Sequence, residues 1–169
     1  MTCSRTSSGL VVSATLAAMV CLLDRSSRPV MAGDLKLLGP SEITTEFHGE
    51  DRPLALPRTR RLILSDGDRL GATAHWSAGP FVHNRDRRFV ADIRLELGAV
   101  NGRNGAVSVL VARDETNVTA GDRQAAVSAA LVRPGISGIE LQVSFVPRDA
   151  STLASGIYTS RVVGTITGN

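Results

Sequence analysis

The sequence predicts an all-β protein with the architecture of an immunoglobulin-like β-sandwich. Three observations support this fold class. Apolar and polar residues alternate with period 2 in several segments, and glycine-containing turns separate those segments. No stretch of 11 or more residues after residue 32 has the apolar period of an amphipathic helix. About seven short strands joined by such turns are typical of a sandwich of two antiparallel sheets.

The two clearest strands are expected at residues 89–97 and 139–145. Every second residue of each segment is apolar, which predicts one face against a core and one face toward water. The residues expected to face water are Asp92, Arg94, Glu96, Glu140, Gln142 and Ser144.

Weaker alternation or β-branched composition predicts the remaining strands. These segments are 61–65, 72–76, 125–132 and 157–167, and a more fully apolar strand is expected at 106–112. The turns expected between strands are Asp66-Gly67, Asn101-Gly102, Asn104-Gly105, Ala120-Gly121-Asp122 and Pro134-Gly135.

Residues 1–32 are predicted to be a signal peptide. Arg5 precedes an apolar run over residues 10–23, which is too short to span a bilayer, and Val30-Met31-Ala32 offers a cleavage site before Gly33. A retained anchor and a lipoprotein modified at Cys21 are the alternatives.

Removal of this leader changes the charge and the cysteine content. From Gly33 onward there are 16 basic and 15 acidic residues, so the net charge is +1 and gives no electrostatic reason to expect nucleic acid as a partner. Both cysteines, Cys3 and Cys21, lie in the leader. The remaining chain is therefore expected to form no disulfide and no thiolate metal site.

Residues 33–57 differ from the rest of the chain. They contain Pro40, Pro53 and Pro57, and one short alternating segment. In that segment Ile43, Thr45 and Phe47 share one face. Two interpretations remain open: this is the first strand of the sandwich, or it is a strand offered to another molecule.

The sequence contains little catalytic or metal-binding chemistry. His48, His75 and His83 have no partner at metal-ligand spacing, and no nucleophile elbow or phosphate-binding loop is present. We therefore expect no enzyme activity, no catalytic residues, no metal and no cofactor. The cluster Arg85-Asp86-Arg87-Arg88 is either a solvated strand end or a site for a polyanion or sugar.

The C-terminal segment resembles that of a known family. Residues Gly156, Tyr158, Val162, Gly164 and Ile166 form a Gly-x-Tyr turn followed by an alternating Val/Thr strand. This ending is similar to that of chaperone–usher fimbrial subunits (pilins). The N-terminal arm makes the alternate, colonisation-factor-antigen type branch the closest match.

The resemblance implies an incomplete sandwich that lacks its last strand. Residues 33–57 would form an arm with the donor strand Ile43, Thr45 and Phe47, and residues 58–169 the pilin domain. The acceptor and chaperone-binding edge would consist of Tyr158, Val162, Gly164 and Ile166. The neighbouring subunit's arm would then complete the sheet by strand addition.

The same resemblance implies the partners and the location. A periplasmic chaperone, an outer-membrane usher and other copies of the chain or related subunits would assemble it, and a host-surface receptor would be met in adhesion. The chain would be exported, pass through the periplasm and end in a fimbrium on the cell surface. The alternative function is a self-complete exported β-sandwich that binds a carbohydrate or receptor, in which the arm pairs with its own sheet.

Overall fold

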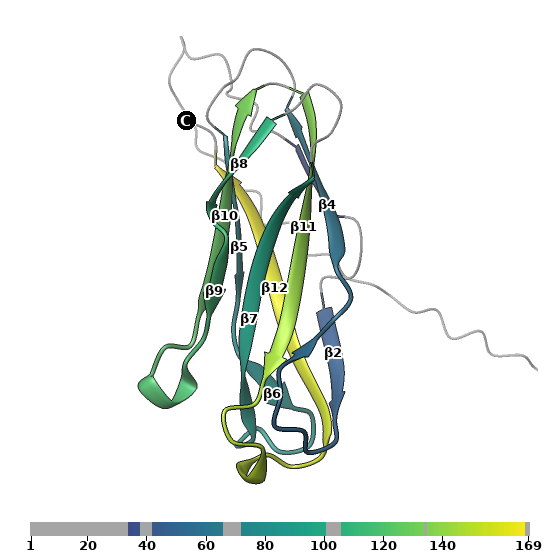
Figure 1. The fold of residues 1–169 in the computed structure, drawn as a ribbon, viewed down its shortest axis with the longest axis vertical. Helices are drawn as coiled ribbons and strands as arrows, with labels where there is room; N and C mark the ends of the chain where they lie inside the picture. The colour runs from purple at the N-terminus through teal and green to yellow at the C-terminus, as the bar shows by residue number, and fades with distance from the viewer. Residues whose placement is uncertain (1–33, 38–41, 66–71, 101–105, 134, 168–169) are drawn as a thin grey trace, which may run out of the picture.

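The computed structural model describes residues 34–37, 42–65, 72–100, 106–133 and 135–167, and these residues form antiparallel strands (Figure 1). Helical structure in these ranges is limited to the short 3₁₀ turns Val118–Ala120 and Ala150–Thr152. The prediction of an all-β protein is confirmed. The predicted signal peptide and the turns expected near residues 66–67 and 101–105 lie outside the described ranges.

One layer contains four strands side by side. In spatial order they are β1 (Asp34–Leu37), β4 (Thr59–Ser65), β11 (Gly135–Val146) and β7 (Val90–Val100). Two short strands extend this layer: β3 (Leu54–Ala55) pairs with β11, and β9 (Arg113–Glu115) pairs with β7.

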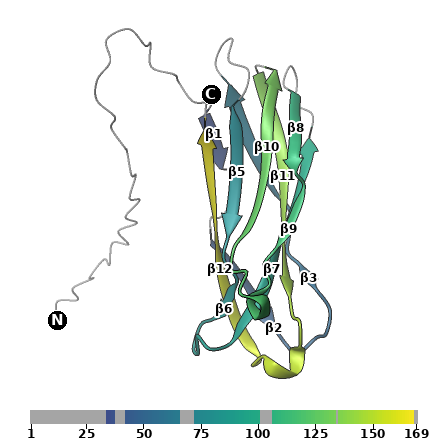
Figure 2. The same cartoon turned by 90° about the vertical axis from the view of Figure 1, so that its left-hand side faces the viewer.

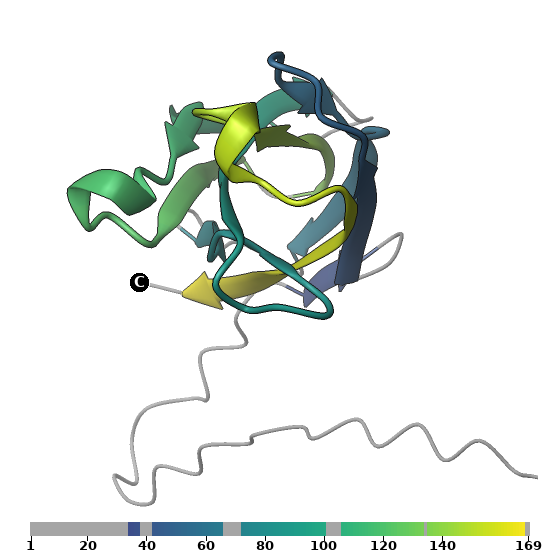
Figure 3. The ribbon, with the colours of Figure 1, turned by 90° about the horizontal axis from the view of Figure 1, so that it is seen from below.

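The second layer contains β12 (Gly156–Thr167), β5 (Thr73–Ala78), β10 (Ala125–Arg133) and β8 (Ala106–Val111) in spatial order. The short strand β6 (Phe81–His83) links the layers, because it pairs with both β7 and β12. Strand β2 (Glu42–Phe47) pairs with β12. The two layers face each other (Figures 2 and 3), and the path of paired strands is open, with β1 and β8 at its ends. This arrangement is consistent with a β-sandwich.

The core consists of the inward face of each layer. Ile93, Leu95 and Leu97 are buried on β7, as the alternation predicted, and Leu141 and Phe145 are buried on β11. Trp76, Val127 and Leu131 contribute the opposite wall. Burial of apolar side chains from both layers is the main stabilising contribution in such a fold.

Two residues predicted to face water are buried. Asp92 is only 2% exposed, because the side chains of Thr116 and Arg148 bond to its carboxylate. Ser144 is also buried, and β3 pairs directly beside it through Ala55. The alternation was right in both places, and at Asp92 the outward face is covered by Thr116 and Arg148.

Every segment predicted as a strand forms one. The strands that the alternation did not predict are β1, β3, β6 and β9, which are four residues long or shorter.

Candidate functional site: the two edges of β12

The partners of β12 divide it into two halves. On one edge, β6 pairs at Tyr158 and Thr159, and β5 pairs along residues 162–167. On the opposite edge, β2 pairs along residues 156–161. Beyond that point, from residue 162 to 167, no strand in the described part of the chain pairs with this second edge. We call it the free edge of β12, and its outward backbone N–H and C=O groups lack a strand partner within the described ranges.

Strand β1 lies beside the free edge but is bonded elsewhere. Its register partners are on β4, from Leu64 opposite Asp34 to Arg61 opposite Leu37. Figure 2 shows β1 next to the C-terminal end of β12. We call the place where they meet the β1–β12 junction. Gly164 lies two residues after the buried Val162, so it is on the same face of β12, and it is exposed.

Strand β2 occupies the other half of the same edge. Thr45 lies directly opposite Tyr158, and both are buried. Phe47 is 4% exposed, with its ring centroid 5.2 Å from that of Phe145 and 6.1 Å from that of Tyr158. Full burial of such an aromatic side chain contributes about 1.5–3 kcal/mol. In a single chain, the predicted donor strand therefore packs on its own domain.

Tyr158 is the centre of this aromatic cluster. Its ring lies 5.2 Å from that of Phe145 and 5.0 Å from that of His83, centroid to centroid. Its hydroxyl donates a 2.9 Å hydrogen bond to the carbonyl of Ala154, and burial raises the pKa of Tyr158. Gly156 begins the strand at φ +147°, and a Cβ there would lie 2.5 Å from Nε2 of His83. The Gly-x-Tyr turn is thus fixed by close packing against His83.

The structure brings together some of the predicted site residues. Ile43, Thr45 and Phe47 lie on the inward face of β2, beside Tyr158. Val162, Gly164 and Ile166 lie beyond β2, on the half of β12 with the free edge. The exchange of these residues between two molecules stays a prediction.

The arginine cluster lies in the loop between β6 and β7. Arg88 donates three hydrogen bonds of 2.7–3.1 Å to the carboxylate of Asp86. Nδ1 of His83 accepts hydrogen bonds from the backbone N–H groups of Arg85 and Asp86, which fixes the turn. The ion pair neutralises part of the positive charge of the cluster, as expected for a solvated strand end, and a polyanion or sugar site here stays a prediction.

We expect the Asp86 carboxyl to titrate with a pKa of about 2 instead of its ordinary 3.8, chiefly because the Arg88 side chain donates hydrogen bonds to it. Since the folded-state pKa is lowered, the contribution of this pair to stability is present above about pH 3.8 and is lost as the pH falls through about 2. A carbon-detected NMR titration of the carboxyl measures this directly. Arg88→Gln should raise the pKa toward 3.8, and an unchanged midpoint in that variant would contradict the assignment.

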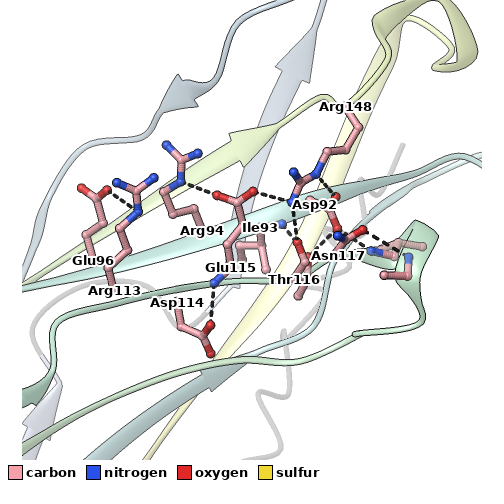
Figure 4. Close-up of polar contacts among 12 residues, drawn as sticks. Asp92, Ile93, Arg94, Glu96, Arg113, Asp114, Glu115, Thr116, Asn117 and Arg148 are labelled. Carbon is pink, nitrogen blue, oxygen red and sulfur yellow. Dashed lines mark hydrogen bonds and ion pairs between the residues drawn. The ribbon is translucent and has the colours of Figure 1, made fainter.

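A network of ion pairs on the outer side of β7 and β9 was not predicted (Figure 4). The Asp92 carboxylate accepts hydrogen bonds from the Thr116 hydroxyl, the Val118 N–H and Nε of Arg148, at 2.8–2.9 Å. Arg148 also binds Glu115, which pairs with Arg94. Each carboxylate in this network has a donor, so we assign it a structural role.

Four buried side-chain atoms, from three residues, have no hydrogen-bond partner among the described residues. The atoms concerned are Nε and Nη1 of Arg61, Nε1 of Trp76 and Oγ of Ser137. Buried polar groups in folded proteins are nearly always bonded, so this set is unusual.

Neither a metal centre nor a membrane-crossing helix is found in the ranges that the structure describes. No three His, Cys, Asp or Glu side chains gather there closely enough to hold a metal ion. The same ranges contain no helix with the length and apolarity needed to cross a bilayer.

The fold and the β12 edges define an antiparallel all-β protein whose last described strand has one edge that is partly occupied and partly free. No family model, curated protein or solved structure matches the chain. Its function is therefore inferred from its own residues.

Proposed function

We propose that this protein is a structural subunit of a surface fimbria, with an immunoglobulin-like sandwich that polymerises head to tail by exchange of β2 between copies. A periplasmic chaperone and an outer-membrane usher would act in its assembly, and the finished fibre would mediate adhesion at the cell surface.

The observation that carries the proposal is the position of β2. Within the described residues, this strand pairs with β12 alone, and it does so at the edge of the sheet. Its removal would uncover Tyr158, and the β2 strand of a second copy could pair there in the same way. Exchange of an identical element between copies is a low-cost route to assembly, because the incoming strand restores the packing that the first strand gives up.

The direction of this exchange favours a filament. The donor strand lies near the N-terminal end of the described chain, and the acceptor strand β12 lies near its C-terminal end. Two different surfaces therefore meet at each contact, so the contact is heterologous and can repeat without closing into a ring. The free edge of β12 adds backbone groups to which an incoming strand can bond.

A disulfide between β2 and β12 tests the exchange. Thr44 and Thr159 are direct register partners on the outward faces of the two strands, and cross-strand pairs have the Cα separation that a disulfide needs. Thr44→Cys/Thr159→Cys would be made with Cys3 and Cys21 changed to serine. We expect the oxidised protein to stay monomeric and the reduced protein to polymerise, as measured by size-exclusion chromatography and electron microscopy.

The matched control is Thr44→Ser/Thr159→Ser in the same background, which should polymerise under both conditions. Fibres formed by the oxidised cysteine variant would show that β2 is not exchanged.

The second candidate is a self-complete exported β-sandwich that binds a carbohydrate or a receptor. The packing of β2 on its own β12 favours it, because the arm then fills its edge without a partner. Under this function the wild-type protein stays monomeric, and the cysteine variant stays monomeric whether it is oxidised or reduced.

A further inference from the structure

The inference concerns the outer side of the second layer, formed by β12, β5, β10 and β8 (Figure 2). In each strand, the residues between the buried positions point away from the core. We call the outward residues of 73–77, 108–111, 126–132 and 163–167 the uncharged face, because none of these segments contains Asp, Glu, Lys or Arg. Four neighbouring strands therefore present one continuous surface without a carboxylate, an ammonium or a guanidinium group.

The outer side of the first layer is covered with charges. Its ion pairs join Arg60 to Glu140, Arg94 to Glu115 and Arg113 to Glu96. Contact between this side of one molecule and the uncharged face of another would take the ion pairs out of water without giving them new partners, which is unfavourable. The uncharged face therefore suits a partner surface that also lacks charges, and the same face of a second copy is such a surface.

Aliphatic side chains are exposed on both margins of the uncharged face. Val163 on β12 is 48% exposed, and Leu110 and Val111 on β8 are 57% and 42% exposed. Exposed aliphatic groups on a continuous surface without charges are typical of a protein–protein contact. The face has no Lys or Arg to attract an anionic lipid surface, which favours a protein as the partner.

A two-fold axis would make the uncharged face complementary to itself. The strands lie in the order β12, β5, β10, β8, so an axis along the strands, between β5 and β10, places β12 of one copy over β8 of the other. Val163 of each copy then lies near Leu110 and Val111 of the other. His75 lies over Ser128 of the second copy, because the register places these two residues at the same height. Apolar groups thus meet apolar groups at both margins, and a large side chain meets a small one in the middle.

We propose that the uncharged face is a self-association surface, through which two copies of the chain pack face to face about this two-fold axis. Four strands about 4.8 Å apart and about 20–30 Å long give each face a projected area of about 400–600 Å². Two such faces bury about 1,000 Å² in total, which is at the low end for specific protein–protein interfaces. The dimer is therefore weak and reversible, with an expected dissociation constant of about 0.1–1 mM.

Sedimentation equilibrium of the oxidised Thr44→Cys/Thr159→Cys protein tests the dimer, because the disulfide prevents polymerisation through β2. We expect a monomer–dimer equilibrium up to about 1 mM protein. His75→Glu should raise the dissociation constant at least about tenfold, since it places a carboxylate against an uncharged partner surface. The matched control is His48→Glu, the same substitution at a side chain 66% accessible and outside the face, which should leave the constant unchanged.

Three results would overturn the inference. They are a locked protein that stays monomeric at about 1 mM, an association that His75→Glu leaves unchanged, and one that His48→Glu weakens as much. Binding to phosphatidylcholine vesicles that His75→Glu abolishes, without any dimer in solution, would assign the face to a lipid surface instead.

A charge exchange between two variants tests the two-fold arrangement and guards against misfolding. Val163→Arg and Leu110→Glu, each made in the locked protein, should both dimerise at least about tenfold more weakly than their parent. An equal mixture of the two should associate again, because the arginine of one variant then faces the glutamate of the other. A misfolded variant could not be rescued in this way. Two weakened variants whose mixture stays monomeric would overturn the inference.

This inference does not depend on the exchange of β2, because the uncharged face uses the outward side chains of its strands and not their edges. The two can fail separately. A protein that polymerises on reduction, but whose locked form is monomeric at about 1 mM, disproves only the self-association of the face. A protein that dimerises in the locked form, but forms no fibres on reduction, disproves only the fimbrial function.

Discussion

Replacing Phe47 with alanine should lower the free energy of unfolding by about 3–5 kcal/mol, as is usual when a buried aromatic ring is removed from a core. Phe47 is buried against Phe145 and Tyr158, so the substitution leaves a cavity at the centre of the aromatic cluster. Urea denaturation followed by the fluorescence of Trp76 measures the change.

The control for this variant is His48→Ala, at the next residue along the chain. His48 is exposed, with a side chain 66% accessible, and should change the free energy by no more than about 0.5 kcal/mol. A loss below about 1 kcal/mol for Phe47→Ala would mean that β2 is not docked on its own domain in solution. Such a result would favour a projecting arm, the second of the two interpretations that the sequence left open.

Asp92→Ala should destabilise the protein by about 2–4 kcal/mol, because it removes the acceptor of the buried Thr116 hydroxyl and of the Val118 N–H. It also releases Arg148 from a carboxylate 2.8 Å away. Thermal unfolding monitored by circular dichroism provides the measurement. Asp92→Asn keeps an acceptor oxygen at the same position, so it should lower the stability less than Asp92→Ala does.

Glu96→Gln is the matched control on the same strand. Glu96 pairs with Arg113 at 3.5 Å, and the two side chains are 38% and 56% accessible to solvent, so the expected loss is under about 1 kcal/mol. If Asp92→Ala and Glu96→Gln lower the stability equally, the buried network around Asp92 contributes no more to stability than the ion pair of Glu96.

The strands were predictable because their signal is local. In the segment 89–97 the alternation alone identified the inward residues, and the structure buries Ala91, Ile93, Leu95 and Leu97. Short strands such as β6 were missed, because three residues are too few to show a period. The burial of Arg61 was also missed. Thr59 and Arg61 lie two residues apart on β4, so they share one face, and this spacing could have indicated that Arg61 points inward.

The candidate site was predictable only in its parts. The sequence predicted two strands, one around Ile43 and Phe47 and one at the C-terminal segment with Tyr158. It also predicted that the first strand would pair with the edge of the second. It did not establish whether they meet in one chain or in two. The structure pairs Thr45 with Tyr158 within one chain, and leaves Val162 to Thr167 without a partner on that edge in the described residues.

The sequence by itself determined the all-β class and the inward face of each longer strand, because period-2 alternation depends only on neighbouring residues. Among the described residues, the tertiary structure alone decided which strand pairs with β12 and why Asp92 and Arg61 are buried. These features depend on interactions between residues far apart in the chain, such as Asp92 with Arg148 and Thr45 with Tyr158. A local pattern specifies which side of a strand is apolar, but long-range pairing determines what lies against either side.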